Sequence, residues 1–175
     1  GTVYVKPGLS AQYGEPAPGS DPIINATEPN VASIYVGDKA GGLAELTIVD
    51  GGSIDVTTRF RLGAYLGTPF TPLSEGQLNM EGGVLNLKSG SVGIELANKN
   101  SEGYIYMTGG EINTPSINMK AKSTSNTLAR VDLLGGTINV GSGGLNWDQP
   151  WNDNSSVLNI TEGTSKSNLF RAREL

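Results

Sequence analysis

The stretch VDLLGGTINV, at residues 131–140, alternates apolar and polar residues, stops at two glycines, and then alternates again. Alternation with a period of two predicts β-strands, because successive side chains of a strand point to opposite faces. Val131 and Leu133 then share one face of the first strand. Glycine adopts positive φ without steric penalty, so the Gly-Gly pair predicts a tight corner before a second short strand.

This pattern occurs four more times along the chain. The related segments are ELTIVDGGSIDV (45–56), QLNMEGGVLNL (77–87), YIYMTGGEINT (104–114) and the degenerate VLNITEGTS (157–165). The copies are separated by 32, 27, 26 and 27 residues when they are aligned on their first apolar residue: Leu46, Leu78, Ile105, Val131 and Leu158. The longer first step is assigned to an insertion, TPFTPL. Such a period indicates a solenoid, in which each coil buries its apolar residues against its neighbours.

Each coil is predicted to hold three short strands. After the first strand and the Gly-Gly corner, apolar pairs mark a second strand at Ile54/Val56, Leu85/Leu87, Ile112/Thr114 and Ile138/Val140, and a third at Phe60/Leu62, Ile94/Leu96, Ile117/Met119 and Leu145/Trp147. The expected fold is all-β, a right-handed parallel β-helix with about 26–27 residues per coil. We expect an irregular N-terminal cap at 1–30, the β-helix at 31–165, and a C-terminal cap or tail at 166–175.

The composition excludes several kinds of site. The 175 residues have a net charge of -5, with 17 acidic side chains against 12 Lys and Arg, so no nucleic-acid partner is expected. Histidine and cysteine are absent, which removes Ser-His-Asp and Cys-His triads, histidine metal sites and disulfides. No apolar run reaches membrane-spanning length and no signal peptide is visible. The chain opens at Gly1, and we expect a module of a longer, secreted bacterial protein with no membrane partner.

The outward positions of the third strands form a mixed polar face. They carry Arg59 and Arg61, then Glu95, then Asn118 and Lys120, then Asn146 and Asp148. We expect no two carboxylates at the same register on adjacent coils. Three interpretations remain open: a solvated face, a sugar-binding face, and the site of a polysaccharide lyase or hydrolase with an arginine base.

The segment WDQPWNDNSS, at residues 147–156, holds both tryptophans. Trp147 and Trp151 are suited to stacking on sugar rings, with Asp148 and its polar neighbours binding hydroxyl groups. Alternatively, Trp147 points inward two residues after Leu145, and Trp151 covers the core. The acidic residues here also offer oxygen ligands for calcium, but without EF-hand spacing we assign no metal and no cofactor.

Two tyrosines and a row of amides are also predicted to point outward. Tyr104 and Tyr106 share a face with Asn79 and Asp132, which indicates either a sugar-contact strip or cross-strand packing. The second strands carry a polar ladder, for which we favour a structural role over contact with a glycan lying along the axis. Its members are Asp55, Asn86, Asn113 and Asn139.

The pattern apolar-x-apolar-x-Gly-Gly-x-apolar-x-apolar, closed by FRLG (60–63), resembles the strand repeats of secreted bacterial surface proteins such as autotransporter passenger domains. It is also similar to carbohydrate-binding modules built as parallel β-helices, some of them attached to xylan-degrading enzymes. The resemblance covers about residues 31–165. It implies a non-catalytic module, fused to a catalytic domain, that binds a plant cell-wall polysaccharide, with xylan as the first ligand to test. The alternatives are a structural spacer or adhesin segment and, less favoured, a small lyase or hydrolase.

Overall fold

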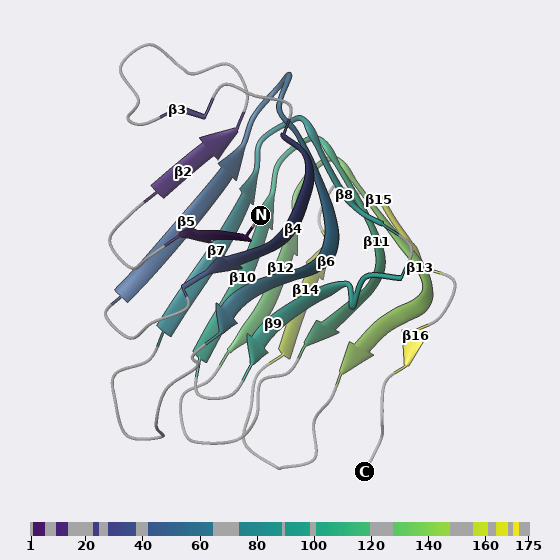
Figure 1. The fold of residues 1–175 in the computed structure, drawn as a ribbon. Coiled ribbons are helices and arrows are strands. Elements are labelled where there is room, and N and C mark those ends of the chain that lie inside the picture. Colours follow the sequence, from purple (N-terminus) through teal and green to yellow (C-terminus); the bar gives the residue numbers. More distant parts are fainter. Residues whose placement is uncertain are drawn as a thin grey trace.

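In a computed structural model the chain forms stacked parallel coils (Figure 1). The structure describes residues 2–5, 10–13, 23–24, 28–37, 42–64, 74–88, 90–98, 101–119, 128–147, 156–160, 164–167 and 170–171. Side chains are described within 31–37, 43–63, 74–88, 90–98, 101–119 and 128–146. No helix occurs in these ranges, and every strand pairing in them is parallel.

The first sheet consists of the strands that precede the Gly-Gly corners. Its seven strands lie in the order β14 (Ser156–Ile160), β12 (Ala129–Leu133), β10 (Ser101–Met107), β7 (Ser74–Met80), β5 (Gly42–Ile48), β2 (Ser10–Tyr13) and β3 (Ile23–Ile24). Strands β5, β7, β10 and β12 run side by side as straight arrows in Figure 1. The first sheet is therefore an extended face that crosses successive coils.

The second sheet contains the two strand segments that follow each Gly-Gly corner. Its main path runs through β1 (Thr2–Val5), β4 (Glu28–Val36), β6 (Ser53–Ala64), β8 (Val84–Leu87), β11 (Glu111–Met119), β13 (Thr137–Trp147) and β15 (Thr164–Ser167). Strand β9 (Ile94–Asn98) pairs with β6 and β11, and β16 (Phe170–Arg171) pairs with β13. In β6, β11 and β13 both segments form one curved strand (Figure 1), whereas β8 and β9 are separate.

The strand register confirms the predicted parallel solenoid with three strand segments per coil. In the first sheet one register column consists of Leu46, Leu78, Ile105, Val131 and Leu158. In the second sheet the third segments align Ile34, Phe60, Ile94, Ile117 and Leu145. The described inward residues of both columns are buried, so the alternating apolar residues form one continuous core.

The Gly-Gly corners follow the same backbone path in successive coils. Gly83, Gly110 and Gly136 have φ of 65°, 79° and 78°. The amide of Glu111 donates to the carbonyl of Gly83 (2.9 Å), and the amide of Thr137 donates to that of Gly110 (3.0 Å). These corners therefore require glycine for its backbone conformation and continue the hydrogen-bond ladder between the two sheets.

Short strands also occur in both terminal segments. Strand β1 pairs with β4, and β2 pairs with β5, so the sheets extend into the region that the sequence predicted to be an irregular cap. Val3 and Val5 lie in register with Ile34 and Val36, an alternation too short to recognise beside the proline-rich residues that follow. In the tail, β16 pairs with β13. The predicted insertion at residues 68–73 lies outside the described residues, between β6 and β7.

Candidate functional site

The outward side chains of β5, β7, β10 and β12 form a surface that we call the tyrosine face. They alternate along each strand with the buried residues of the core. The register places them in three rows: Leu43, Glu75 and Glu102; Glu45, Gln77, Tyr104 and Arg130; and Thr47, Asn79, Tyr106 and Asp132.

Tyr106 is the most exposed aromatic side chain among the described residues, at 41% of its maximal accessible area. Asn79 and Asp132 lie in register with it on the two adjacent strands, about 4.8 Å away on each side. Tyr104 precedes it by two residues on the same face and is half-buried. The predictions that both tyrosines point outward, and that Asn79 and Asp132 flank Tyr106, are therefore confirmed.

Hydrogen bonds fix the polar side chains of the tyrosine face. Gln77 Nε2 donates to Asn79 Oδ1 (2.6 Å), and Asn79 Nδ2 donates to Glu45 Oε1 (3.3 Å). Arg130 and Asp132 form an ion pair, with 2.7 Å between Nε and Oδ2. The groups on both sides of the Tyr106 ring are thus held in place before any ligand arrives.

Tyr104 is held as a neutral hydrogen-bond donor. Burial raises its pKa well above the ordinary tyrosine value, and its hydrogen bond to the Glu102 carboxylate, together with the negative charges of Glu102 and Glu75, raises it further. The positive charge of Arg130 opposes this shift. The phenol of Tyr104 therefore stays protonated at neutral pH and donates to Glu102.

Glu75 and Glu102 share a register on the adjacent strands β7 and β10. The expectation of no shared carboxylate register concerned the third strands, so the sequence analysis did not identify this pair on the first sheet. The available signal was the repeated Ser-Glu-Gly at 74–76 and 101–103, which starts both strands. Within the described part of the chain, no group of three or more acidic residues is placed to hold a metal ion.

The polar ladder of the second strands is hydrogen-bonded along the axis. The Nδ2 atom of each asparagine donates to the preceding coil: Asn86 to Asp55 (3.0 Å), Asn113 to Asn86 (2.9 Å) and Asn139 to Asn113 (2.8 Å). These contacts agree with the structural role favoured from the sequence, because the amides satisfy one another.

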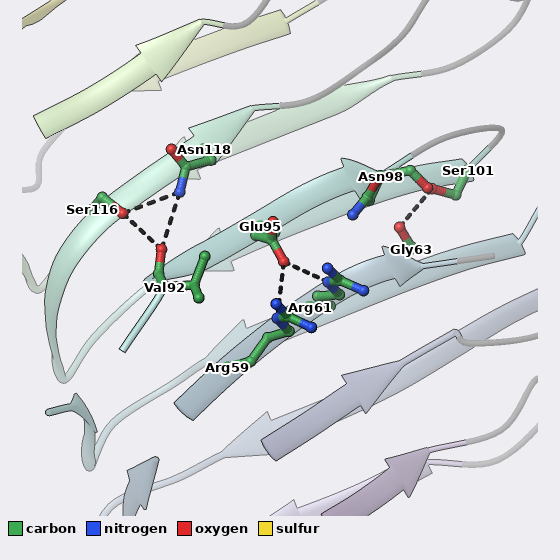
Figure 2. Close-up of polar contacts among 9 residues, drawn as sticks. All are labelled: Arg59, Arg61, Gly63, Val92, Glu95, Asn98, Ser101, Ser116 and Asn118. Atoms are coloured by element: carbon green, nitrogen blue, oxygen red, sulfur yellow. Dashed lines mark hydrogen bonds and ion pairs between the residues drawn. The ribbon is translucent and has the colours of Figure 1, made fainter. Parts of the chain in front are cut away.

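A different face carries the arginines. Arg59 and Arg61 of β6 both point toward Glu95 of β9 (Figure 2). Arg61 Nε donates to Glu95 Oε2, and Arg59 Nε lies 3.4 Å from the same oxygen. Asn118, the next outward position beyond Glu95, donates to the carbonyl of Val92 (3.2 Å) and to Ser116 Oγ (3.0 Å).

The predicted binding residues therefore fall into two separate groups. Tyr104 and Tyr106 lie on the first sheet, whereas Arg59, Arg61 and Asn118 lie on the second. Trp147 ends β13 in backbone register with Met119, and its side chain is not described. The remaining three, Lys120, Asp148 and Trp151, lie outside the described residues, so the tryptophan platform stays a prediction.

Comparison with protein-family models, curated proteins and solved structures found no significant match to this chain. None of its described segments is a helix long and apolar enough to cross a membrane. The case for function accordingly depends on the geometry and chemistry of the two faces.

Proposed function

We propose that this chain is a non-catalytic carbohydrate-binding module that binds a polysaccharide through the tyrosine face. The observation that carries the proposal is the exposed ring of Tyr106 on an extended sheet, between Asn79 and Asp132 in register. An exposed phenol ring offers an apolar surface with a polar edge, which suits the apolar face of a pyranose ring.

The sheet geometry also suits an extended chain of sugars. Adjacent strands are about 4.8 Å apart, close to the length of one sugar unit in an extended polysaccharide. A glycan that crosses the strands while stacking on Tyr106 would bring its neighbouring units over Asn79 and Asp132. Amide and carboxylate groups exchange hydrogen bonds with sugar hydroxyls, so polar contacts accompany the stacking.

The wider setting of the module rests on composition and resemblance. The acidic, cysteine-free chain and its likeness to β-helical modules of xylan-degrading enzymes support a secreted bacterial protein. We propose that the module directs a fused catalytic domain to a plant cell-wall polysaccharide, and xylan is the first ligand to test.

Affinity electrophoresis tests this proposal, with native gels that contain xylan, mannan, β-glucan, pectin or no polysaccharide. We expect one polymer to retard the protein and Tyr106→Ala to weaken that binding about tenfold, as loss of a central aromatic contact does. Val92→Ala is the matched control, because Val92 is also 41% exposed. It lies just before β9 of the second sheet and so away from the tyrosine face. Equal mobility in every gel would instead favour a structural spacer or adhesin segment.

The shared register of Glu75 and Glu102 supports a second candidate, a small polysaccharide hydrolase. Two carboxylates on neighbouring strands can act as general acid and as base or nucleophile at a glycosidic bond. This candidate predicts release of reducing ends from the polymer that retards the protein. It also predicts loss of that release in Glu75→Gln, with binding retained.

A further inference from the structure

We infer that Arg59 and Arg61 form a subsite for the carboxylate groups of an acidic polysaccharide. The inference rests on the proposed function in taking a polysaccharide as the ligand. It uses the second sheet, however, and depends on none of the contacts of the tyrosine face. The expected ligand is a polymer that bears carboxylates, and it binds at a second surface.

The charges of this cluster do not balance. Two guanidinium groups share the single carboxylate of Glu95, whose side chain is only 2% exposed. A buried carboxylate needs a charged partner, and one arginine supplies it. The second arginine leaves one net positive charge on the cluster.

The two arginines hold different positions in the cluster. Arg61 is the inner one: its side chain is 14% exposed, it donates to Glu95, and its guanidinium lies 5.8 Å from the centre of the Tyr35 ring. Arg59 is 33% exposed, and its Nε is buried without a hydrogen-bond partner among the described residues. Arg61 thus anchors Glu95, whereas Arg59 is the more exposed arginine and makes the longer contact with Glu95.

The neighbours of Arg59 along the axis are small. Ser33 is in register with it on β4. On the other side Phe60 pairs with Ile94, so the position next to Arg59 belongs to Gly93, which has no side chain. Figure 2 shows the side chains of Arg59 and Arg61 both pointing toward Glu95, and Arg59 is the more exposed of the two. A ligand group can therefore approach the cluster over Arg59, with Arg61 behind it.

The chemistry of this arrangement favours a carboxylate. Guanidinium groups present paired N–H donors whose spacing matches the two oxygens of a carboxylate, and such charged hydrogen bonds are stronger than neutral ones. A neutral sugar hydroxyl would leave the extra positive charge uncompensated. Because the whole chain has a net charge of -5, general attraction to a polyanion is absent and binding must come from a local site.

A pair of polymers with similar backbones tests the inference. Native gels contain either carboxymethyl cellulose, which bears carboxylates, or hydroxyethyl cellulose, which is neutral. We expect the protein to be retarded by carboxymethyl cellulose beyond any effect of the neutral polymer, and Arg59→Gln to weaken that binding about tenfold. Arg59→Lys keeps the positive charge but loses the paired N–H donors of the guanidinium group. It should weaken binding of carboxymethyl cellulose less than Arg59→Gln does.

Thermal unfolding of each variant confirms that it is folded; Glu95 keeps Arg61 as its partner when Arg59 is replaced. Equal retardation by both polymers, or unchanged binding in Arg59→Gln, would overturn the inference. Tyr106→Ala separates the two proposals, because it should weaken binding through the tyrosine face and spare binding of carboxymethyl cellulose.

Discussion

Gly37, Gly63 and Ala97 occupy equivalent positions at the corner that leads from the second sheet back to the first. Each follows a residue of one register column, Val36, Leu62 or Leu96. All three have positive φ, 70°, 65° and 55°, and Ala97 is the one non-glycine with positive φ in the described chain. A Cβ atom on Gly63 would also collide with the backbone oxygen of Glu102 on the next strand. Backbone conformation and close packing thus both restrict this residue to glycine.

At the residue scale, we predict that Gly63→Ala lowers the free energy of unfolding by about 3 kcal/mol, because left-handed strain and a backbone collision add together. Gly51→Ala is the control: Gly51 has φ of 81°, but no atom lies within 4 Å of a Cβ placed there. Its expected loss is about 1 kcal/mol, from strain alone. Urea denaturation of both variants measures the difference, and equal losses would show that the collision at Gly63 relaxes without penalty.

The asparagine ladder shows how elements far apart in the sequence are joined. Asn113 donates to Asn86 on the preceding coil and accepts from Asn139 on the following one. Each bond links strands of the second sheet through side chains, in addition to the backbone pairing. Because outward amides at equal register can satisfy one another, the ladder ties neighbouring coils together without burying apolar surface.

At the element scale, we predict that Asn113→Ala lowers the free energy of unfolding by about 1–3 kcal/mol. The substitution removes two hydrogen bonds, each with a small net contribution to stability. Thr58→Ala, at an exposed corner position of β6, should change it by less than about 0.5 kcal/mol. Chemical denaturation provides both values. A loss at Asn113 no larger than at Thr58 would mean that water replaces the ladder contacts at no net free-energy change.

The whole molecule is a stack in which each coil packs against its neighbours. One inward column of the first sheet consists of Ile48, Met80, Met107 and Leu133, all fully buried. Ile48 and Met80 are in register on adjacent strands, whereas Ile48 and Leu133 are three strands apart, roughly 14 Å. Stability in such a stack is expected to be a sum of coil terms and nearest-neighbour terms.

At this scale, we predict that Ile48→Val and Met80→Ala are coupled by at least about 0.5 kcal/mol in a double-mutant cycle. Ile48→Val and Leu133→Ala should instead be additive to within about 0.5 kcal/mol. Equilibrium unfolding of the single and double variants gives both coupling energies. Strong coupling across three coils would contradict a nearest-neighbour stack.

The sequence by itself determined the coils, their corners and the core. Alternation along one strand is enough to place Leu78 and Met80 on its inward face. Positive φ is enough to favour glycine at corners such as Gly110. Both are local rules, so a repeated pattern reveals them directly. The outward direction of Tyr106 followed from the same alternation.

Only the tertiary structure decided how the arginines are paired. The contacts of Arg59 and Arg61 with Glu95 depend on the longer connection between Leu87 and Ile94, which sets the register of β9 against β6. The shared register of Glu75 and Glu102, by contrast, follows the same 27-residue step that aligns Leu78 with Ile105. Alternation gives the face of a residue, but the pairing of coils gives its neighbours. Pairing depends on the backbone path of each connection, which no local pattern encodes.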